Sequence, residues 1–126
     1  MKFMAIGYFD RAAMDALTPA ELDAVMAQCG PLMGPLYGTG KVLLDVGLAT
    51  QARCVRTQGG ELRVTDGPFA EAKELIGSGM LIEADSMEEA VRVTAMHPAA
   101  ALAAGERLGW RMEVRPVPFF NDCAPG

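Results

Sequence analysis

Four stretches of the chain carry the apolar or alternating pattern that predicts a β-strand. In the first of them, Phe3 and Ala5 share one face, and the opposite face is also apolar. The third stretch is likewise apolar except for Glu83. Strands that are apolar on both faces are typical of the centre of a sheet that is covered twice. The four predicted strands are residues 2–9, 42–49, 79–84 and 110–117.

A first helix is predicted over residues 18–30, because Thr18-Pro-Ala-Glu21 is a capping box with proline at the first helical position. Apolar residues continue at helical spacing beyond it. Gly30-Pro31 and Gly34-Pro35 interrupt that spacing, since proline removes an internal hydrogen bond. A kinked or broken second piece is therefore expected.

A second helix is predicted after Ser86, where Ser86-Met-Glu-Glu89 forms another capping box. His97-Pro98 ends or kinks this helix, and residues 99–104 are expected to add a turn closed by Gly105. The residues expected on one face of the helix are Met87, Ala90, Val91 and Thr94.

A β-hairpin is predicted where residues 53–57 and 61–65 flank Gln58-Gly59-Gly60. A two-residue turn at the glycines opposes Arg56 with Arg63. One face of the hairpin is then apolar, with Val55, Thr57, Leu62 and Val64. Asp66-Gly67-Pro68 breaks the second strand, and a short helix is expected near residues 70–76.

Without this hairpin, the order of elements is that of the ferredoxin-like βαββαβ fold, an α+β class. Two helices cover only one face of a four-stranded sheet. Because a monomer does not tolerate an exposed apolar patch of that size, we expect a homodimer packed sheet against sheet. Residues 1–117 are predicted to form one domain, and residues 118–126 a mobile C-terminal tail.

Composition narrows the classes of function. The 126 residues include 11 Lys and Arg and 16 Asp and Glu, for a net charge of −5. An acidic surface disfavours nucleic-acid binding, which needs cations against phosphates. The three cysteines are widely spaced and predict reduced thiols. The N-terminal apolar run is too short for a signal peptide or a membrane span, so a cytoplasmic protein with no membrane partner is expected.

The stretch DGPFAEAKE at residues 66–74 resembles the DGPFAETKE motif of the YCII-related (DGPF) family. MKFMAIGY, LIEADSMEEA and EVRPV also fit that family, so the resemblance runs through residues 1–117. The resemblance implies a dimeric α+β barrel. It also implies a superfamily of small-molecule enzymes, including lactone isomerases, a dehalogenase and cofactor-free monooxygenases, together with ligand-sensing domains.

The chain departs from the family pattern in three places. Ala72 replaces the threonine of the motif, and Gly79-Met80 stand where two aromatic residues are usual. One branch of the family carries a His-Asp pair proposed as catalytic, with its histidine in the first half of the chain. His97 is the only histidine here, so that pair cannot be carried over.

Asp66 and His97 are the candidate catalytic residues, and each also has a structural interpretation. Asp66 either caps the turn before Pro68 or acts as a general base. His97 either caps a helix end or acts as a base. One histidine without a nearby second ligand predicts no metal site.

Four charged residues are candidates for substrate binding. Arg56 and Arg63 face each other across the hairpin, and like charges directly opposite each other repel. A bound anion or a carboxylate of a partner subunit would relieve this repulsion. Alternatively, both side chains extend into solvent. Glu71 and Lys73 either form a solvated face or engage a substrate acid or the partner subunit.

Two functions are therefore open. The first is a cofactor-free enzyme that acts on a small acidic molecule by proton transfer, with Asp66 as the base. The alternative is a non-catalytic module that binds a small ligand or a partner. A pocket with convergent polar groups favours the enzyme, and a pocket filled by Met and Leu favours the module.

Overall fold

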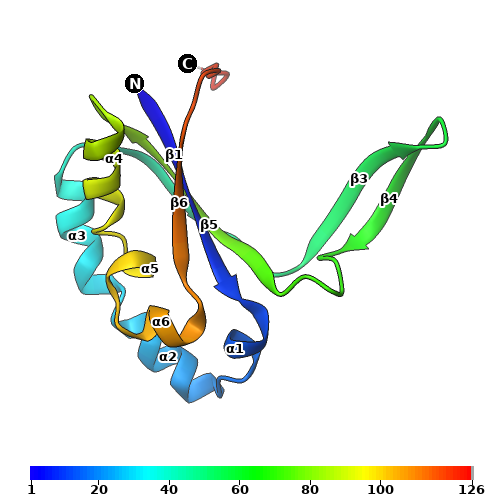
Figure 1. Ribbon diagram of the computed structural model, residues 1–126, viewed down its shortest axis with the longest axis horizontal. Helices are drawn as coiled ribbons and strands as arrows, with labels where there is room; N and C mark the ends of the chain where they lie inside the picture. The colour runs from blue at the N-terminus through cyan, green and yellow to red at the C-terminus, as the bar shows by residue number, and fades with distance from the viewer. Residues whose placement is uncertain (126) are drawn as a thin grey trace.

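The computed structural model describes residues 1–125 and is an α+β fold (Figure 1). Four antiparallel strands form one sheet in the order β2-β5-β1-β6, which is consistent with a ferredoxin-like fold. The two strands predicted to be central, β1 and β5, lie in the middle of the sheet. The strands are β1 Lys2–Asp10, β2 Val42–Gly47, β5 Glu74–Glu83 and β6 Arg111–Pro116.

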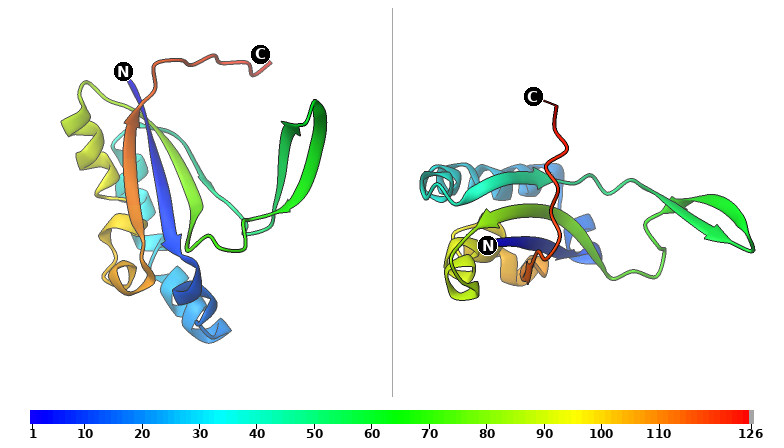
Figure 2. Two further views of the ribbon diagram at one scale, coloured as in Figure 1. Left: turned by 45° about the vertical axis from the view of Figure 1, so that its right-hand side comes forward. Right: turned by 90° about the horizontal axis from the view of Figure 1, so that it is seen from above.

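Within residues 1–125, six helices gather on one side of this sheet and at one of its ends (Figures 1 and 2). They bury the Phe3 and Ala5 face of β1, together with Leu36, Met80 and Ile82. The opposite face carries no helix of the described part of the chain. The helices are α1 Arg11–Asp15, α2 Pro19–Ala27, α3 Gly30–Gly38, α4 Met87–Thr94, α5 Pro98–Ala101 and α6 Ala104–Leu108. No helix in residues 1–125 is long and apolar enough to cross a membrane.

The first capping prediction is confirmed. Thr18 Oγ1 accepts from the Glu21 amide at 3.2 Å, and Glu21 Oε1 accepts from the Thr18 amide at 2.9 Å. A break separates α2 from α3 as predicted, but it falls at Gln28-Cys29, and Gly30-Pro31 begin α3. Pro35 lies inside α3 without ending it.

The second capping motif forms only in part. Ser86 Oγ accepts from the Glu89 amide, but the Glu89 carboxylate accepts from the amide of Asp85, one residue before the cap. The expected apolar face of α4 is also corrected at one position. Val93 is buried and Val91 is exposed, because positions 90, 93 and 94 are the ones that face the sheet.

The short helix expected at residues 70–76 is wrong, because β5 begins at Glu74. Leu75 pairs with Phe9 and Ile76 with Tyr8, beyond a register shift at Gly7/Tyr8. These residues extend a central strand of the sheet. Pairing with β1 satisfies the backbone and overrides the helical preference of a Glu- and Lys-rich segment.

The turn at Asp66-Gly67-Pro68 also differs from expectation. Gly67 is the last residue of β4 and is not among the residues with positive φ, so it does not need glycine's left-handed freedom. The Gly67-Pro68 peptide bond is cis. Among the hydrogen bonds of the described chain, Asp66 caps no backbone amide; its carboxylate lies 3.2 Å from Arg53 Nε.

The end of the helical segment is displaced from its predicted place. Gly105 does not end the helical segment; it lies buried inside α6, where an added Cβ would be 3.2 Å from Trp110 Cβ. Gly109 ends α6 instead, with φ of 65°. Beyond Pro116 no regular element follows within the described chain, and the last residue of the predicted tail, 126, lies outside it.

The predicted hairpin consists of β3 Ala52–Gln58 and β4 Glu61–Gly67, here called the arm. Its register is as predicted, with Arg56 opposite Arg63 and Val55 opposite Val64. Gly59 and Gly60 both have positive φ, as a type I′ turn requires. The arm projects away from the body of the molecule (Figure 2).

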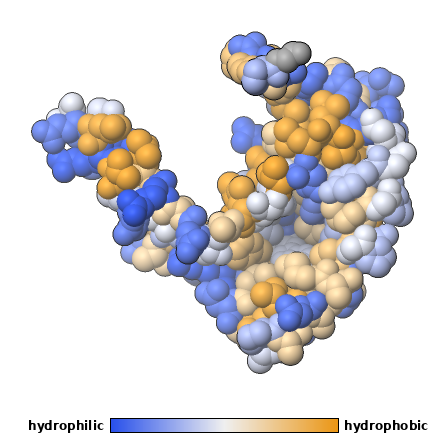
Figure 3. Space-filling view, turned by 180° about the vertical axis from the view of Figure 1, so that it is seen from behind, coloured by the Kyte–Doolittle hydropathy of each residue, from blue (hydrophilic) through white to orange (hydrophobic). Residues whose placement is uncertain are grey.

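The helix-free face of the sheet, here called the open sheet face, is apolar. It carries Met4 and Ile6 from β1 and Leu44 and Val46 from β2, and the last two are each 46% exposed. Figure 3 shows hydrophobic surface on the body and on the projecting arm, with a hollow between them. In a single chain, therefore, only one of the two apolar faces of β1 is fully covered.

Candidate functional site

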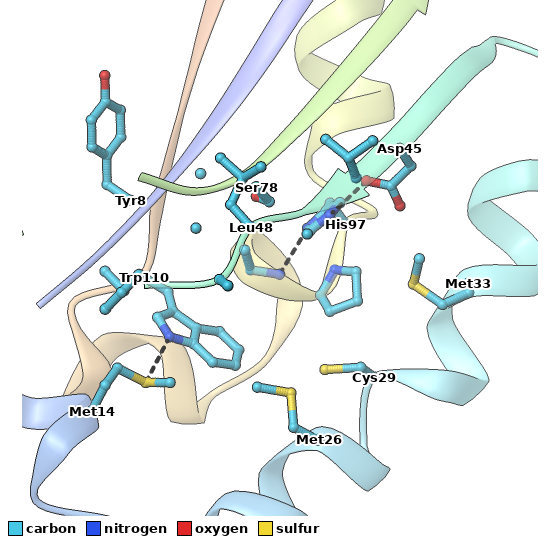
Figure 4. Close-up of a pocket in the computed structure, with 18 of the residues that line it drawn as sticks. Tyr8, Met14, Met26, Cys29, Met33, Asp45, Leu48, Ser78, His97 and Trp110 are labelled. Carbon is cyan, nitrogen blue, oxygen red and sulfur yellow. Dashed lines mark hydrogen bonds and ion pairs between the residues drawn. The ribbon is translucent and has the colours of Figure 1, made fainter. Parts of the chain in front are cut away.

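A cavity of about 660 Å³ opens between one end of the sheet and helices α2, α3 and α5 (Figure 4). Its wall is mostly apolar, and polar side chains interrupt it, among them Tyr8, Thr50 and the four described next. The strands supply Asp45 and Ser78, and the helical segments supply Tyr37 and His97. The main apolar residues of the wall are Met14, Leu22, Met26, Met33, Leu48 and Trp110.

Asp45 is the centre of the polar group. It is the only charged residue of β2, and its side chain is 11% exposed. Tyr37 Oη donates to Asp45 Oδ2 at 2.6 Å. His97 Nε2 lies 3.6 Å from Asp45 Oδ1. A carboxylate this buried needs such partners, because an unpaired charge is costly away from water.

The proton position on His97 follows from its backbone contact. His97 is the N-cap of α5, and its Nδ1 accepts from the Ala99 amide at 3.0 Å. An accepting Nδ1 carries no proton, so the neutral ring carries its proton on Nε2, which faces Asp45. Burial lowers the pKa of His97, and the carboxylate of Asp45 only partly opposes this. The ring is therefore neutral at neutral pH.

Tyr37 is held as a hydrogen-bond donor. Its hydrogen bond to the Asp45 carboxylate raises the pKa of Tyr37 to about 12. The phenol therefore keeps its proton across the physiological range, and it can share that proton with Asp45 or with a bound molecule.

The sulfur-containing side chains of the cavity wall serve mainly as packing residues. Trp110 Nε1 donates to Met14 Sδ at 3.3 Å, which closes the cavity at the α1 side. Burial raises the pKa of the Cys29 thiol, so this cysteine stays protonated and is a poor nucleophile. Flexible thioethers instead provide a wall that adapts to the shape of a ligand.

We expect the protein to become less stable as the pH is lowered, because His97 is buried in the folded state. Its folded-state pKa lies below the unfolded value of 6.5. The unfolded chain then binds the extra proton first, so the free energy of unfolding falls as pH drops from about 6.5 through the folded-state pKa.

The variant His97→Asn should flatten this dependence, because asparagine keeps an N-cap acceptor and does not titrate. The free energy of unfolding of the wild type and of His97→Asn is measured by urea unfolding at several pH values between about 7 and 5. An equal loss of stability in the variant would show that other groups cause the dependence.

Of the six residues proposed from the sequence, His97 is the one that lies in the cavity wall. Asp66 lies on the exposed arm, with a side chain that is 90% exposed and paired with Arg53. Arg56 donates to Gln58 and Arg63 to Glu61, each at 3.4 Å.

The two remaining candidates lie between the arm and β5. Glu71 and Lys73 are exposed, and the Lys73 carbonyl accepts from the Arg11 amide. The structure thus separates the candidates of the arm and its loop from the cavity.

Sequence reasoning missed Asp45 and Tyr37. Asp45 had a signal, since it is a lone charge within the apolar strand VLLDVG. A His-Asp pair therefore exists in this chain after all, although His97 stands in its second half. Within residues 1–125, no group of three or more His, Cys, Asp or Glu side chains is placed to hold a metal ion.

Comparison with known proteins finds a protein family and similar solved structures. The model of the YCII-related domain matches residues 1–111. A solved structure that is similar is 5-chloro-2-hydroxyhydroquinone dehydrochlorinase from Burkholderia phenoliruptrix AC1100, in complex with 2,5-dihydroxybenzoquinone. It is 14% identical over 93% of each chain, with a TM-score of 0.49. No curated protein matches the chain.

Proposed function

This chain belongs to the YCII-related domain family, and on that premise we propose that it is a small cofactor-free enzyme that transfers a proton on a molecule bound in the cavity. The observation that carries the proposal is the convergence of Tyr37, Asp45 and His97 on an apolar cavity. An apolar pocket with a few convergent polar groups is the usual form of a small-molecule site.

Asp45 is the base in this proposal. Tyr37 and His97 each approach a different oxygen of its carboxylate, so the group is fixed in place and keeps lone pairs for a ligand. A ligand would give a proton to Asp45 and become an anion. Tyr37 keeps its own proton and can donate a hydrogen bond to that anion, and Asp45 returns the proton to a second position.

The charges around the cavity favour a neutral ligand. Among the described residues that line it, none is Lys or Arg, and Asp45 is a carboxylate. A second carboxylate brought beside Asp45 would be repelled in a poorly solvated site. We therefore propose an apolar molecule that carries a hydroxyl or carbonyl group, in place of an acid, as the occupant of the cavity.

The test is proton exchange with solvent. The protein is incubated in deuterium oxide with a panel of neutral hydroxylated or carbonyl compounds and with small carboxylic acids. We expect deuterium to enter a carbon-bound position of at least one neutral compound, seen by mass spectrometry after the hydroxyl hydrogens have been exchanged back in ordinary water, and we expect none to enter that position in the absence of protein. Binding of such a compound without exchange would contradict an enzymatic role.

A non-catalytic ligand-binding module is the second candidate. The observation in its favour is that His97 Nδ1 already caps α5 and that three methionines line the cavity. Both features also suit a site that only holds an apolar molecule. The same panel separates the two, since a module gives a thermal shift with the compound and no deuterium incorporation.

The acidic ligand remains a separate proposal for the arm. Arg56 and Arg63 face each other there, and guanidinium groups bind carboxylates in bidentate fashion. Small dicarboxylates in the panel are expected to raise the melting temperature, and the double variant Arg56→Ala with Arg63→Ala to abolish that shift. Glu71 and Lys73 are exposed near the base of the arm. We propose that their charges contribute to the electrostatic potential that an acidic ligand of the arm meets.

We also propose that the protein is a homodimer through its open sheet faces. Leu44 and Val46 are about half exposed on that face, and Met4 and Ile6 are only partly covered. A second copy would remove this apolar surface from water at one two-fold interface. The oligomeric state is measured together with the arm variants described next.

A further inference from the structure

The arm presents an apolar face that nothing in the described chain covers. Its three large apolar residues, Val55, Leu62 and Val64, are 64%, 71% and 54% exposed. Because side chains alternate along a strand, these three lie on one face with Thr57. Within residues 1–125, β3 and β4 pack against each other and against no other element to a comparable extent.

An isolated arm of this kind is unfavourable in water. A lone two-stranded hairpin is at best marginally stable, and both of its strands are unpaired edges. The register of this arm is nevertheless well specified, with seven paired positions and a glycine turn. A well-specified hairpin with one apolar face indicates a surface that docks.

We propose that the apolar face of the arm docks on a second copy of this chain, so that each subunit of the dimer clasps the other. The inference rests on the homodimer proposed above and adds the arm to its interface. The receiving surface is the apolar rim of the open sheet face, at Leu44 and Val46. Two-fold symmetry then buries both arms at once.

Charge complementarity favours a second copy as the occupant. The arm carries three arginines against two carboxylates, whereas the rest of the chain carries eight cations against fourteen carboxylates. A weakly cationic arm is therefore attracted by the acidic body of another copy.

The opposite face of the arm supplies a matched control. Cys54, Arg56, Arg63 and Thr65 lie there, and the arginines donate to neighbouring polar side chains. Val64 and Thr65 are neighbours on β4, are both exposed, and point to opposite faces. An aspartate at either position adds the same charge to the same strand.

The experiment compares dimer dissociation constants by sedimentation equilibrium. Val64→Asp should weaken the dimer at least about tenfold, since it would place a charge within an apolar contact. Thr65→Asp should leave the dissociation constant near that of the wild type. Val46→Asp, on the open sheet face, should weaken the dimer as well.

The outcomes separate the proposals. A dimer that Val64→Asp does not weaken, or that both arm variants weaken equally, overturns the arm contact whatever the effect of Val46→Asp, because Val46 belongs both to the sheet-face contact and to the surface that receives the arm. A wild-type monomer at micromolar concentration overturns both contacts. Catalysis in the cavity is measured independently, by the deuterium exchange assay on each variant.

The variant Val64→Asp could weaken the dimer only because its arm unfolds, so hydrogen exchange of the wild-type protein provides an independent test. In the wild type, amides of β3 and β4 should exchange more slowly above the dimer dissociation constant than after dilution below it, while amides of α4 stay unchanged. Exchange in the arm that does not depend on concentration would overturn the proposal without any variant.

Discussion

Asp45→Asn should slow proton transfer by about 10²–10⁴-fold, measured as deuterium incorporation into the compound that the wild type exchanges. Asparagine has nearly the same size, and its single amide oxygen can still accept from either Tyr37 or His97, so the cavity keeps its shape. What it loses is the negative charge that takes the proton. Binding of the compound should change much less than its exchange rate.

Asp66→Asn is the matched control for this experiment. Asp66 is the base that the sequence suggested, and its side chain is 90% exposed on the arm, where it pairs with Arg53. We expect exchange in this variant to remain near the wild-type rate. If Asp66→Asn abolishes exchange and Asp45→Asn does not, the base lies on the arm, and the cavity is not the catalytic site.

Gly109→Ala should lower the free energy of unfolding by about 2–5 kcal/mol. Gly109 ends α6 with φ of 65°, a conformation that costs an L residue about 1–2 kcal/mol. In addition, a Cβ there would lie 2.7 Å from Asp10 Cβ and 3.1 Å from Asp10 N. The contact involves backbone, so a side-chain rotation cannot relieve it.

The clash would also disturb the start of α1. Asp10 is the N-cap of that helix, and its Oδ1 accepts from the Ala13 amide at 2.8 Å. Gly59→Ala separates the two costs, because Gly59 has φ of 62° but no atom within 4 Å of the added Cβ. Urea unfolding should show a clearly smaller loss for Gly59→Ala, and equal losses would remove the steric explanation.

The sequence by itself determined the parts of this protein that depend on local pattern. Strand periodicity identified the two central strands, the capping box at Thr18 located α2, and Gly59-Gly60 fixed the register of the arm down to the opposition of Arg56 and Arg63. Turn geometry, capping and alternation act between residues that are close in the chain, so they can be read without the fold. The DGPFAEAKE motif indicated the family for the same reason.

Tertiary structure alone decided the segment after that motif and the candidate site. Glu74, Leu75 and Ile76 follow a segment whose composition favours a helix, yet they form a strand because they pair with β1. His97 became part of a site only when the fold brought its ring beside Asp45 of β2. Such contacts join residues that are far apart in the chain. The local hydrophobic pattern therefore cannot predict that the ring of His97 lies beside the carboxylate of Asp45.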